Sequence, residues 1–390
     1  MVDHVLALNA GSSSLKFGLY ELAENNLPCV RWHGQIERLG DAPRLLAKST
    51  DGQTINQPLA KTQSHDEAIR AFLEMAREQL PDINIRAVGH RVVHGGAVYS
   101  EPVLVDQKVM DVLAGFIPFA PLHQPFSLTG IGAAIDAFPG TAQVACFDTA
   151  FHRTHPWVND TFALPLSYYE KGVRRYGFHG LSYDYITQKL KEIAPSLYDG
   201  RVVIAHLGNG ASMCAVSGGR AVASTMGFSA LDGLPMGTRS GQLDPGVVLY
   251  MMQQEGMSAD EIADTLYRKS GLLGLSGLSS DMRTLLAAET PEARRAIDYY
   301  VFRIRRELGA LSAALEGLDA LVFTGGIGEN AAQIRRRICE GMRWIGIEID
   351  PNRNADNGTV LSTDFSRVRI LRIPTNEEMV IARAAARMVQ

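Results

Sequence analysis

The stretch Val5–Leu22, which reads VLALNAGSSSLKFGLYEL, decides the fold class of this chain. Val5–Leu8 is apolar, Asn9–Ser14 is rich in glycine and serine, and Leu15–Leu22 returns to a strand-like composition. Two strand-like runs joined by a short glycine-containing segment are typical of a β-hairpin. The sequence therefore predicts a hairpin at the start of the chain.

A second unit of the same kind lies near the middle of the chain. Arg201–Leu207 is strand-like, Gly208–Gly210 is a turn signal, and Ala211–Val216 returns as a strand. Two such units about half a chain apart indicate a duplicated architecture, although the sequences of the two hairpins are only weakly alike.

Helical patterns lie between and after these hairpins. One apolar stripe starts at Ala68 and stops before Pro81, and a longer one follows Pro291. The mixture of hairpins and alternating strands and helices predicts α/β layers. We place one domain over residues 1–150 and a second over residues 151–377, with the helix at about 378–390 packing back on the first.

The composition limits the classes of protein to which this chain can belong. The 390 residues are 46% hydrophobic and 21% charged, and a net charge of −4 gives no electrostatic reason to expect nucleic acid or a membrane surface as partner. Three of the four cysteines lie in apolar stretches, so we expect buried thiols in a reducing cytoplasm. No apolar run reaches the roughly 18 residues of a membrane span, so we expect a soluble chain.

Three glycine-rich turns are candidates for binding phosphate. Gly11–Lys16 adds three hydroxyls and one ammonium to a turn, but it lacks the second glycine of a Walker A loop. Gly208–Gly210 contains Asn-Gly, which is also the commonest hairpin turn. Each of these two is explained equally by an ordinary tight turn. Gly325–Asn330 joins a strand at Ala320–Thr324 to a helix expected near Ala331, a place that suits a nucleotide.

The third turn also allows a different function. Gly326-x-Gly328-x-x-Ala331 fits a dinucleotide fingerprint, and Asp350 follows the strand-like run Ile345–Ile349 at a suitable distance. This alternative is an NAD-dependent dehydrogenase. Only about forty residues follow Asp350, too few for the βαβαβ continuation of that fold.

Four further segments place histidine, arginine or aspartate beside glycines or strand ends. Helix or strand interiors disfavour glycine, whereas loops that bind an anion do not. We therefore expect an anion-handling site from Gly89–Gly96, Phe147–His152, Arg174–Gly180 and Met236–Gly241. His90 and His94 have zinc-like spacing, but the flanking glycines argue against zinc. Thr375–Glu378 reads as a capping box at a helix start.

Taken in order, these segments resemble the signature motifs of the acetate kinase family along essentially the whole chain. The resemblance implies a fold shared with sugar kinases, actin and heat-shock ATPases: two duplicated ribonuclease H-like domains (actin-like ATPase domains) flanking a nucleotide cleft. It also implies a cytoplasmic homodimer, with its interface in the second domain, that uses ATP and Mg²⁺ (with Mn²⁺ as a substitute) to convert acetate to acetyl phosphate.

The resemblance further implies roles for individual residues. Asn9 and Glu377 are expected to hold the metal, Arg91 to bind the carboxylate, Asp148 to be the active-site acid, and His179 and Arg239 to stabilise the transferring phosphoryl group. The acyl group is expected among Val93, Leu122, Phe178 and Ala230. The nucleotide is expected at Ser12, Ser14, Lys16, His206, Leu207, Gly208, Asn209, Gly210, Asp281, Met282, Arg283, Gly326, Ile327, Gly328, Glu329 and Asn330.

These roles agree with the chemistry of the reaction. A carboxylate is already ionised at neutral pH, so it needs no general base, and catalysis becomes positioning and charge stabilisation. We therefore expect Asp148 to order water and substrate rather than abstract a proton. Tyr183, Ala230 and Gln242 stand where the family usually has histidine, proline and aspartate. Propionate kinase and a non-catalytic ATPase switch remain alternatives, the latter having no need for Arg91 and Arg239.

Overall fold

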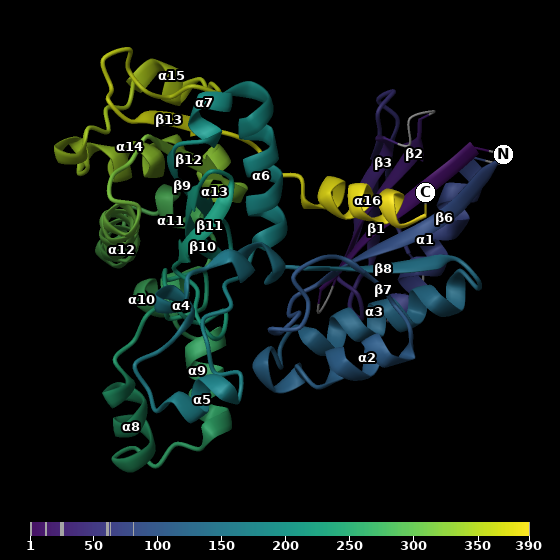
Figure 1. Cartoon of the computed structure of the whole chain (residues 1–390), viewed down its shortest axis with the longest axis horizontal. Coiled ribbons are helices and arrows are strands. Elements are labelled where there is room, and N and C mark those ends of the chain that lie inside the picture. The colour runs from purple at the N-terminus through teal and green to yellow at the C-terminus, as the bar shows by residue number, and fades with distance from the viewer. Residues whose placement is uncertain are drawn as a thin grey trace. The chain divides into compact units, whose positions relative to one another are not determined.

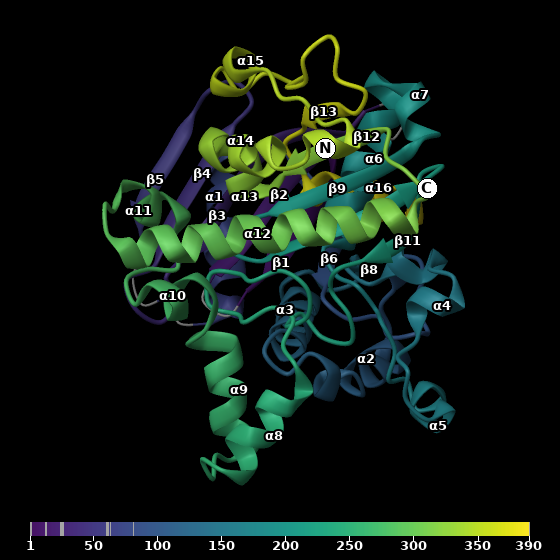
Figure 2. The same ribbon diagram turned by 90° about the vertical axis from the view of Figure 1, so that its left-hand side faces the viewer.

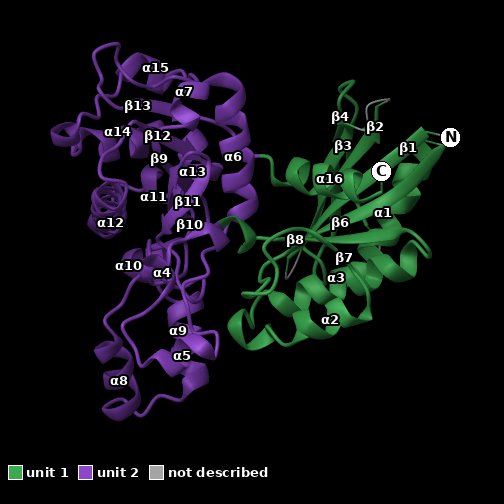
Figure 3. Cartoon of the chain, in the orientation of Figure 1, with its two compact units in different colours: residues 1–151, 376–390 green, residues 152–375 purple. Residues whose placement is uncertain are grey.

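The computed structural model describes residues 2–11, 14–23, 27–59, 62, 64–80 and 82–389. The chain divides into two compact units (Figure 3). The first consists of Met1–Phe151 together with Asn376–Gln390, and the second of His152–Thr375. None of the helices in the described ranges is both long and apolar enough to cross a membrane.

The first unit is built on an eight-stranded sheet with the order β5-β4-β3-β2-β1-β6-β8-β7. Strands β1, β2, β3, β6, β7 and β8 are labelled in Figure 1. The predicted N-terminal hairpin is confirmed, since β1 and β2 pair antiparallel with Asn9 opposite Lys16. β6 runs parallel to β1, and β8 runs parallel to β6. The strands are β1 Val2–Ala10, β2 Ser14–Leu22, β3 Pro28–Glu37, β4 Arg44–Ser49, β5 Thr54–Pro58, β6 Ile83–Val92, β7 Val103–Leu104 and β8 Ala142–Phe147.

Helices cover both faces of this sheet. The predicted helix that begins near Ala68 is α1, which a capping box of Ser64 and Glu67 closes at its start. The helices are α1 His65–Gln79, α2 Gln107–Ala114, α3 Gln124–Ala137 and α16 Glu377–Met388, with 3₁₀ turns at Ile117–Phe119 and Ala150–Thr154.

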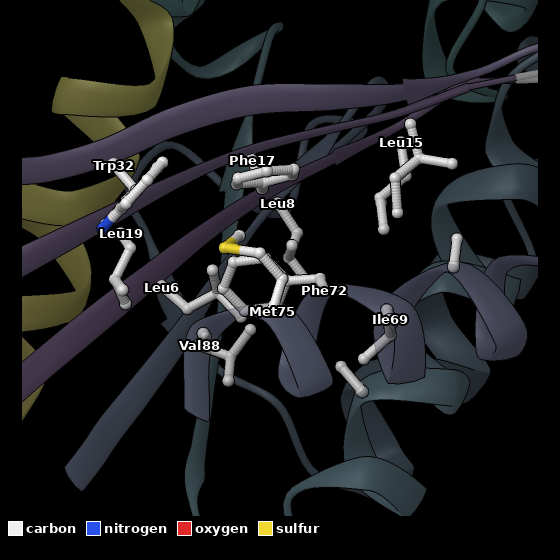
Figure 4. Close-up of a cluster of buried hydrophobic side chains, with 14 of the residues drawn as sticks. Leu6, Leu8, Leu15, Phe17, Leu19, Trp32, Ile69, Phe72, Met75 and Val88 are labelled. Carbon is white, nitrogen blue, oxygen red and sulfur yellow. The ribbon is translucent and has the colours of Figure 1, made fainter. Parts of the chain in front are cut away.

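The main core of the first unit lies between the sheet and α1 and α3. Phe17 of β2 packs on Phe72 of α1 with ring centroids 4.7 Å apart (Figure 4). Val88 of β6 belongs to this core, whereas its neighbour Gly89 faces α16, where an added Cβ would lie 3.1 Å from the Ile381 carbonyl oxygen. Successive strand residues point to opposite faces, so α16 covers the other side of the sheet.

The second unit contains a five-stranded sheet with the order β11-β10-β9-β12-β13. Its strands are β9 Arg201–Leu207, β10 Ala211–Ser217, β11 Arg220–Ser224, β12 Ala320–Thr324 and β13 Arg369–Arg372. The long helix predicted after Pro291 is α12, which packs on β9, β10 and β11 (Figure 2).

The remaining helices of this unit are mostly short. They are α4 Trp157–Asp160, α5 Leu166–Glu170, α6 Gly180–Ile193, α7 Pro195–Tyr198, α8 Pro245–Gln253, α9 Ala259–Arg268, α10 Gly271–Ser276, α11 Met282–Ala287, α12 Pro291–Ala314, α13 Gly325–Asn330, α14 Ala332–Glu340 and α15 Pro351–Ala355, with a 3₁₀ turn at Arg343–Ile345.

The two sheets repeat one topology. In the first unit the order β3-β2-β1-β6-β8 has two antiparallel pairs followed by two parallel pairs. The order β11-β10-β9-β12-β13 of the second unit has the same sequence of directions. The α/β class and the duplication predicted from the hairpins are thus confirmed.

Two local predictions were wrong. Gly325–Asn330 is the short helix α13 rather than an open turn, because Gly325 takes φ 77° and turns the chain directly from β12 into a helix. Ile345–Ile349 is no strand of the sheet but makes only isolated bridges, and Asp350 caps α15 through the amides of Asn352 and Arg353. The dinucleotide-binding continuation after Gly326 is therefore not built.

Candidate active site

Arg91 and Asp148 meet at one edge of the first sheet. Arg91 is the penultimate residue of β6, and Asp148 directly follows β8. The carboxyl ends of parallel strands lie at the same edge, so Asn9 of β1 joins them. Arg91 donates from Nε and Nη2 to Asp148 Oδ2 at 3.0 and 2.5 Å, and from Nη1 to Asn9 Oδ1 at 3.2 Å.

Two carboxyl groups, those of Asp148 and Glu377, lie close to the Arg91 guanidinium at this edge. Asp148 is 1% exposed, and among the described residues its second oxygen, Oδ1, has no hydrogen-bond partner. Burial raises the pKa of Glu377 to about 7, helped by Asp148 and Glu378 and opposed by Arg91 and Lys16. Burial by itself would lower the pKa of Arg91, but Asp148 and Glu377 outweigh it and raise that pKa. A cation bound here would stabilise both groups: the buried oxygen that has no hydrogen-bond partner and the carboxyl group whose pKa is raised.

Glu377 reaches this edge because α16 begins there. The helix starts one residue later than the predicted capping box requires: Asn376 is the cap, and its Oδ1 accepts from the Met379 amide at 2.9 Å. Thr375 is not the cap, because its amide donates to Glu329 Oε1 at 3.1 Å and its hydroxyl accepts from Ser182 at 2.9 Å.

In the second unit, His179 stands at the start of α6 in a left-handed conformation, with φ 57°. Its Nδ1 lies 2.8 Å from Ser212 Oγ, and the buried Tyr183 hydroxyl lies 2.5 Å from the same oxygen. The His179 and His206 rings stack at 4.3 Å. His206 Nδ1 lies in turn 2.8 Å from Ser182 Oγ. The orientation of His179 is thus fixed through Ser212, a residue that no sequence motif singled out.

A cavity of about 550 Å³ lies beside the two glycine turns of this unit. Its size is within the range of small-molecule sites. Gly325 packs so closely on β9 that an added Cβ would lie 2.8 Å from the Leu207 carbonyl oxygen, which brings the turns after β9 and β12 together. The lining residues are Gly208, Asn209, Ser280, Asp281, Met282, Arg283, Leu286, Gly326, Ile327, Asn330 and Ala331.

Eight of the predicted nucleotide residues line this cavity, together with Ser280 and Leu286, which no motif singled out, and Ala331, which was named only in the dinucleotide fingerprint. Asp281 caps α11, and hydrogen bonds from the Arg283 side chain and amide lower its pKa to about 2. Glu329 does not line the cavity; its Oε1 accepts from the Gly325 amide at 2.9 Å and braces the turn.

The other predicted nucleotide residues are placed elsewhere. His206 and Leu207 end β9, Gly210 belongs to the turn that follows, and Gly328 lies within α13; none of the four lines the cavity. Ser14 and the exposed Lys16 lie in β2 of the first unit, and Ser12 lies outside the described residues.

The loop that carries Arg239 is attached to the Asn209 turn. The Gly237 amide donates to the Asn209 carbonyl oxygen at 3.1 Å, and an added Cβ at position 237 would lie 2.3 Å from Asn209 Oδ1, so the Asn209 side chain would have to shift. Arg239 Nη1 donates to the Ala230 carbonyl oxygen at 3.4 Å. The loop that carries Arg239 is therefore hydrogen-bonded to a turn that lines the cavity, and both belong to the second unit.

The predicted acyl-pocket residues are divided between the units. Val93, which is buried, and Leu122, which is half-buried, belong to the first unit. Phe178 and Ala230 belong to the second, where the Phe178 carbonyl oxygen lies 2.9 Å from His152 Nε2.

Comparison with known proteins decides the family. The model of the acetokinase family matches residues 4–383. The chain belongs to the acetokinase family. It is 56% identical to the acetate kinase of Methylocella silvestris over 391 residues, covering 97% of this chain and 96% of that protein.

Two solved structures of the family agree with the fold. The acetate kinase of Porphyromonas gingivalis is 38% identical with a TM-score of 0.89, covering 100% of both chains. A propionate kinase from Francisella tularensis is 36% identical with a TM-score of 0.90, covering 98% of both. The acetokinase resemblance and the fold that it implied are both confirmed.

The three residues expected to depart from the family's motifs have distinct surroundings. Tyr183 is fully buried against Ser212, and Ala230 accepts a hydrogen bond from Arg239. Gln242 accepts from Arg303 Nη2 at 2.9 Å and from Arg306, so it links the loop after Arg239 to α12.

Proposed function

We propose that this chain transfers the γ-phosphoryl group of ATP to the carboxylate of acetate, reversibly, to give acetyl phosphate and ADP. The observation that carries this proposal is the environment of Arg91. Its bonds to Asn9 and Asp148 use three of the five guanidinium N–H donors, which leaves two for a substrate carboxylate. A planar fork of this kind suits a carboxylate.

The proposed phosphoryl transfer needs few protein groups besides Arg91. Acetate is ionised at neutral pH, so Asp148 need not act as a base and instead orients Arg91 and water. In the second unit, His179 would donate a hydrogen bond to the transferring group from Nε2 once Nδ1 is engaged with Ser212. Arg239 would neutralise charge that develops on the same group.

Oxygen atoms at the Arg91 edge fit Mg²⁺. Asp148 Oδ1 is buried and unbonded within the described chain, and Asn9 and Glu377 add an amide oxygen and a carboxylate. Mg²⁺ prefers oxygen ligands and keeps several waters, so Asn9 and Glu377 suffice as direct ligands, with Asp148 hydrogen-bonding a metal-bound water; Mn²⁺ would fit the same oxygens. Bound there, the ion would offset repulsion between the nucleotide phosphates and the substrate carboxylate.

We assign the cavity of the second unit to ATP and ADP. Gly326 and Ile327 lie in the first turn of α13 and line the cavity, and the backbone amides of a helix start suit phosphate oxygens. The apolar Met282, Leu286 and Ile327 suit the base. Ser12, Ser14 and Lys16 remain proposed contacts for the phosphates.

Propionate is a second proposed substrate. An alanine at position 230 lacks the ring that a proline would place there, and one further methylene is worth only about 0.8 kcal/mol in an apolar pocket. A hydrophobic pocket discriminates one methylene by only about 1–3 kcal/mol. We expect propionate to react within about tenfold of acetate in kcat/KM.

We further propose that the protein is a cytoplasmic homodimer. Support comes from apolar side chains exposed on two helices of the second unit: Leu249, Tyr250 and Met252 on α8, and Phe302 on α12, which is 60% exposed. Light scattering coupled to size exclusion tests the dimer, and a particle of single-chain mass would contradict it.

The proposed activity is tested by ADP release in the presence and absence of acetate. The account predicts release that depends on acetate and Mg²⁺ and that Arg91→Ala weakens. Arg336→Ala, on an exposed face of α14, serves as the control and should behave as wild type. ATP hydrolysis that ignores acetate would favour the ATPase switch instead.

A further inference from the structure

Three side chains of types that bind metals converge in the second unit, next to the loop that carries His179 but with none of the three assigned to phosphoryl transfer. His152 lies in the 3₁₀ turn Ala150–Thr154, His155 follows that turn, and Cys214 lies in β10. One ligand atom from each residue lies within 4.8 Å of the other two. His152 and His155 belong to one segment, whereas Cys214 lies 62 positions after His152, so the fold brings Cys214 to the two histidines.

The hydrogen bonds of His152 fix which ring nitrogen carries its lone pair. His152 Nε2 lies 2.9 Å from the Phe178 carbonyl oxygen, which only accepts, so Nε2 carries the proton. Nδ1 therefore presents a lone pair, and it faces Cys214 Sγ at 3.9 Å. Histidines that bind metals commonly donate their other N–H to a backbone carbonyl in this way.

His155 supplies an independent observation. Both of its ring nitrogens are buried, and neither has a hydrogen-bond partner among the described residues. Its ring packs at 5.3 Å from the His152 ring. Buried polar atoms in folded proteins normally have a partner, so an imidazole with both nitrogens unsatisfied calls for a ligand.

We propose that His152, His155 and Cys214 form a binding site for a borderline-soft divalent cation, with Zn²⁺ as the best match and the fourth position open to water. Two imidazoles and one thiolate are a ligand set that Zn²⁺ accepts, whereas Mg²⁺ prefers oxygen. In a tetrahedral zinc site the nitrogen and sulfur ligands stand about 3.6 Å apart. The Nδ1–Sγ separation of 3.9 Å is close to that value.

The charges around the site favour neutral imidazoles. Burial, with a smaller effect of Arg153 and Arg175, lowers the pKa of His155 to about 4, and burial also lowers the pKa of His152. Both arginines would repel a cation. Each is paired with a carboxylate, Arg153 with Asp160 at 3.1 Å and Arg175 with Asp232 at 3.0 Å, which offsets that repulsion.

Binding changes the protonation of one group. Burial raises the pKa of the Cys214 thiol, so the metal must displace its proton to solvent as the S–metal bond forms. Neither histidine loses a proton, because both are neutral before binding. Binding of Zn²⁺ therefore releases the proton of the Cys214 thiol.

The site adjoins the loop that carries His179. His152 holds the carbonyl of Phe178, and an added Cβ at Gly177, which has φ 73°, would lie 2.5 Å from the His152 ring. The Tyr183 ring also meets His152 edge-on at 5.6 Å. A bound cation would hold His152 in this orientation and thus stabilise the Gly177–His179 backbone.

The experiment is a Zn²⁺ titration of metal-stripped protein in competition with a chromophoric chelator. Cys214→Ala and His155→Gln should each weaken binding at least about 100-fold, since even loss of a partner behind a ligand costs 10–100-fold. Cys339→Ala is the matched control, because Cys339 is an equally buried thiol of the same unit outside the cluster. It should bind Zn²⁺ as wild type does.

Two further measurements separate loss of the site from loss of the fold. Thermal melts without metal should show both variants folded, and Zn²⁺ should raise the melting temperature of wild type and Cys339→Ala only. Co²⁺ should produce a thiolate charge-transfer band that Cys214→Ala abolishes. Zn²⁺ affinity within twofold of wild type in both site variants, or Co²⁺ binding without that band, would overturn the proposal and place any bound ion at other histidines.

Discussion

Arg91 and Asp148 form an ion pair in which two guanidinium nitrogens, Nε and Nη2, bind the same oxygen of the buried Asp148 carboxylate, while the Arg91 side chain stays 22% exposed. This geometry leaves Asp148 Oδ1 without a hydrogen-bond partner among the described residues, and leaves Arg91 with N–H groups to spare. The pair therefore has two separate consequences, one for stability and one for the binding of an anion.

Arg91→Ala is expected to weaken acetate binding more than it slows turnover, because the arginine is assigned to the substrate carboxylate. It should also reduce the free energy of unfolding by about 3 kcal/mol, since Asp148 would remain as an uncompensated buried charge. Adding Asp148→Asn to the variant should restore part of that stability but none of the acetate affinity. Steady-state kinetics and urea denaturation measure the two effects, and an unchanged KM for acetate would remove Arg91 from substrate binding.

Arg239→Ala is expected to lower kcat about 10²–10³-fold, the scale for loss of one donor that acts in the transition state. Its KM for acetate should change little, in contrast to Arg91→Ala. Arg336→Ala controls for the loss of a cation from the same unit. Near-normal kcat in Arg239→Ala would show that this arginine takes no part in the chemical step.

Variants of Tyr183 and Ser212 should distinguish a structural role from a role in positioning His179. Tyr183→Phe removes one hydroxyl from a buried pair and should cost about 1 kcal/mol of stability with little loss of kcat. Ser212→Ala removes the partner of His179 Nδ1 and should lower kcat more than Tyr183→Phe does. A large rate loss in Tyr183→Phe at unchanged melting temperature would instead make the tyrosine hydroxyl catalytic.

The raised pKa of Glu377 predicts how the stability of the protein and its affinity for Mg²⁺ change with pH. That pKa is raised from 4.5 to about 7 in the folded protein, so between these values the folded state binds more protons than the unfolded state. Without metal, the contribution of Glu377 to stability is therefore lost as the pH rises toward 7. Since Mg²⁺ must displace that proton, its affinity should rise about tenfold per pH unit below 7 and level off above.

Glu377→Gln is the matched variant for this effect. It cannot ionise, so it should bind Mg²⁺ more weakly and flatten the dependence of Mg²⁺ affinity on pH between about 5 and 7. Calorimetric titration at several pH values measures both. A wild-type affinity that does not change with pH would contradict the assignment of Glu377 to the metal.

Ala230→Pro is expected to shift the ratio of kcat/KM values toward acetate and away from propionate, because a proline ring would occupy the space left for one methylene. The kinetic comparison uses both acids under identical conditions. An unchanged ratio would show that position 230 does not shape the acyl pocket.

The sequence predicted those features that short-range patterns determine. The hairpin at Val5–Leu22 and the helix after Pro291 follow from alternation, periodicity and turn residues. The helix at Gly325 was missed, because glycines are weak helix formers and tertiary contact with β9 decides the conformation there.

Parts of the site depend on contacts between segments distant in sequence. Ser212 positions His179 across 33 residues, and no pattern around Ser212 marks it. Glu329 was predicted as a nucleotide contact, whereas its carboxylate bonds the Gly325 and Thr375 amides. Thr375 lies close to Glu329 because β13 pairs with β12, and the sequence alone does not specify that pairing.

Acyl phosphate formation tests the central claim most directly. The purified protein is incubated with ATP, Mg²⁺ and acetate, and the product is trapped with hydroxylamine as the hydroxamate, with propionate and butyrate in parallel. The account predicts acetyl hydroxamate in amounts equal to the ADP formed, and ATP synthesis when acetyl phosphate and ADP are supplied instead. Folded protein that forms no hydroxamate from any of these acids would contradict it.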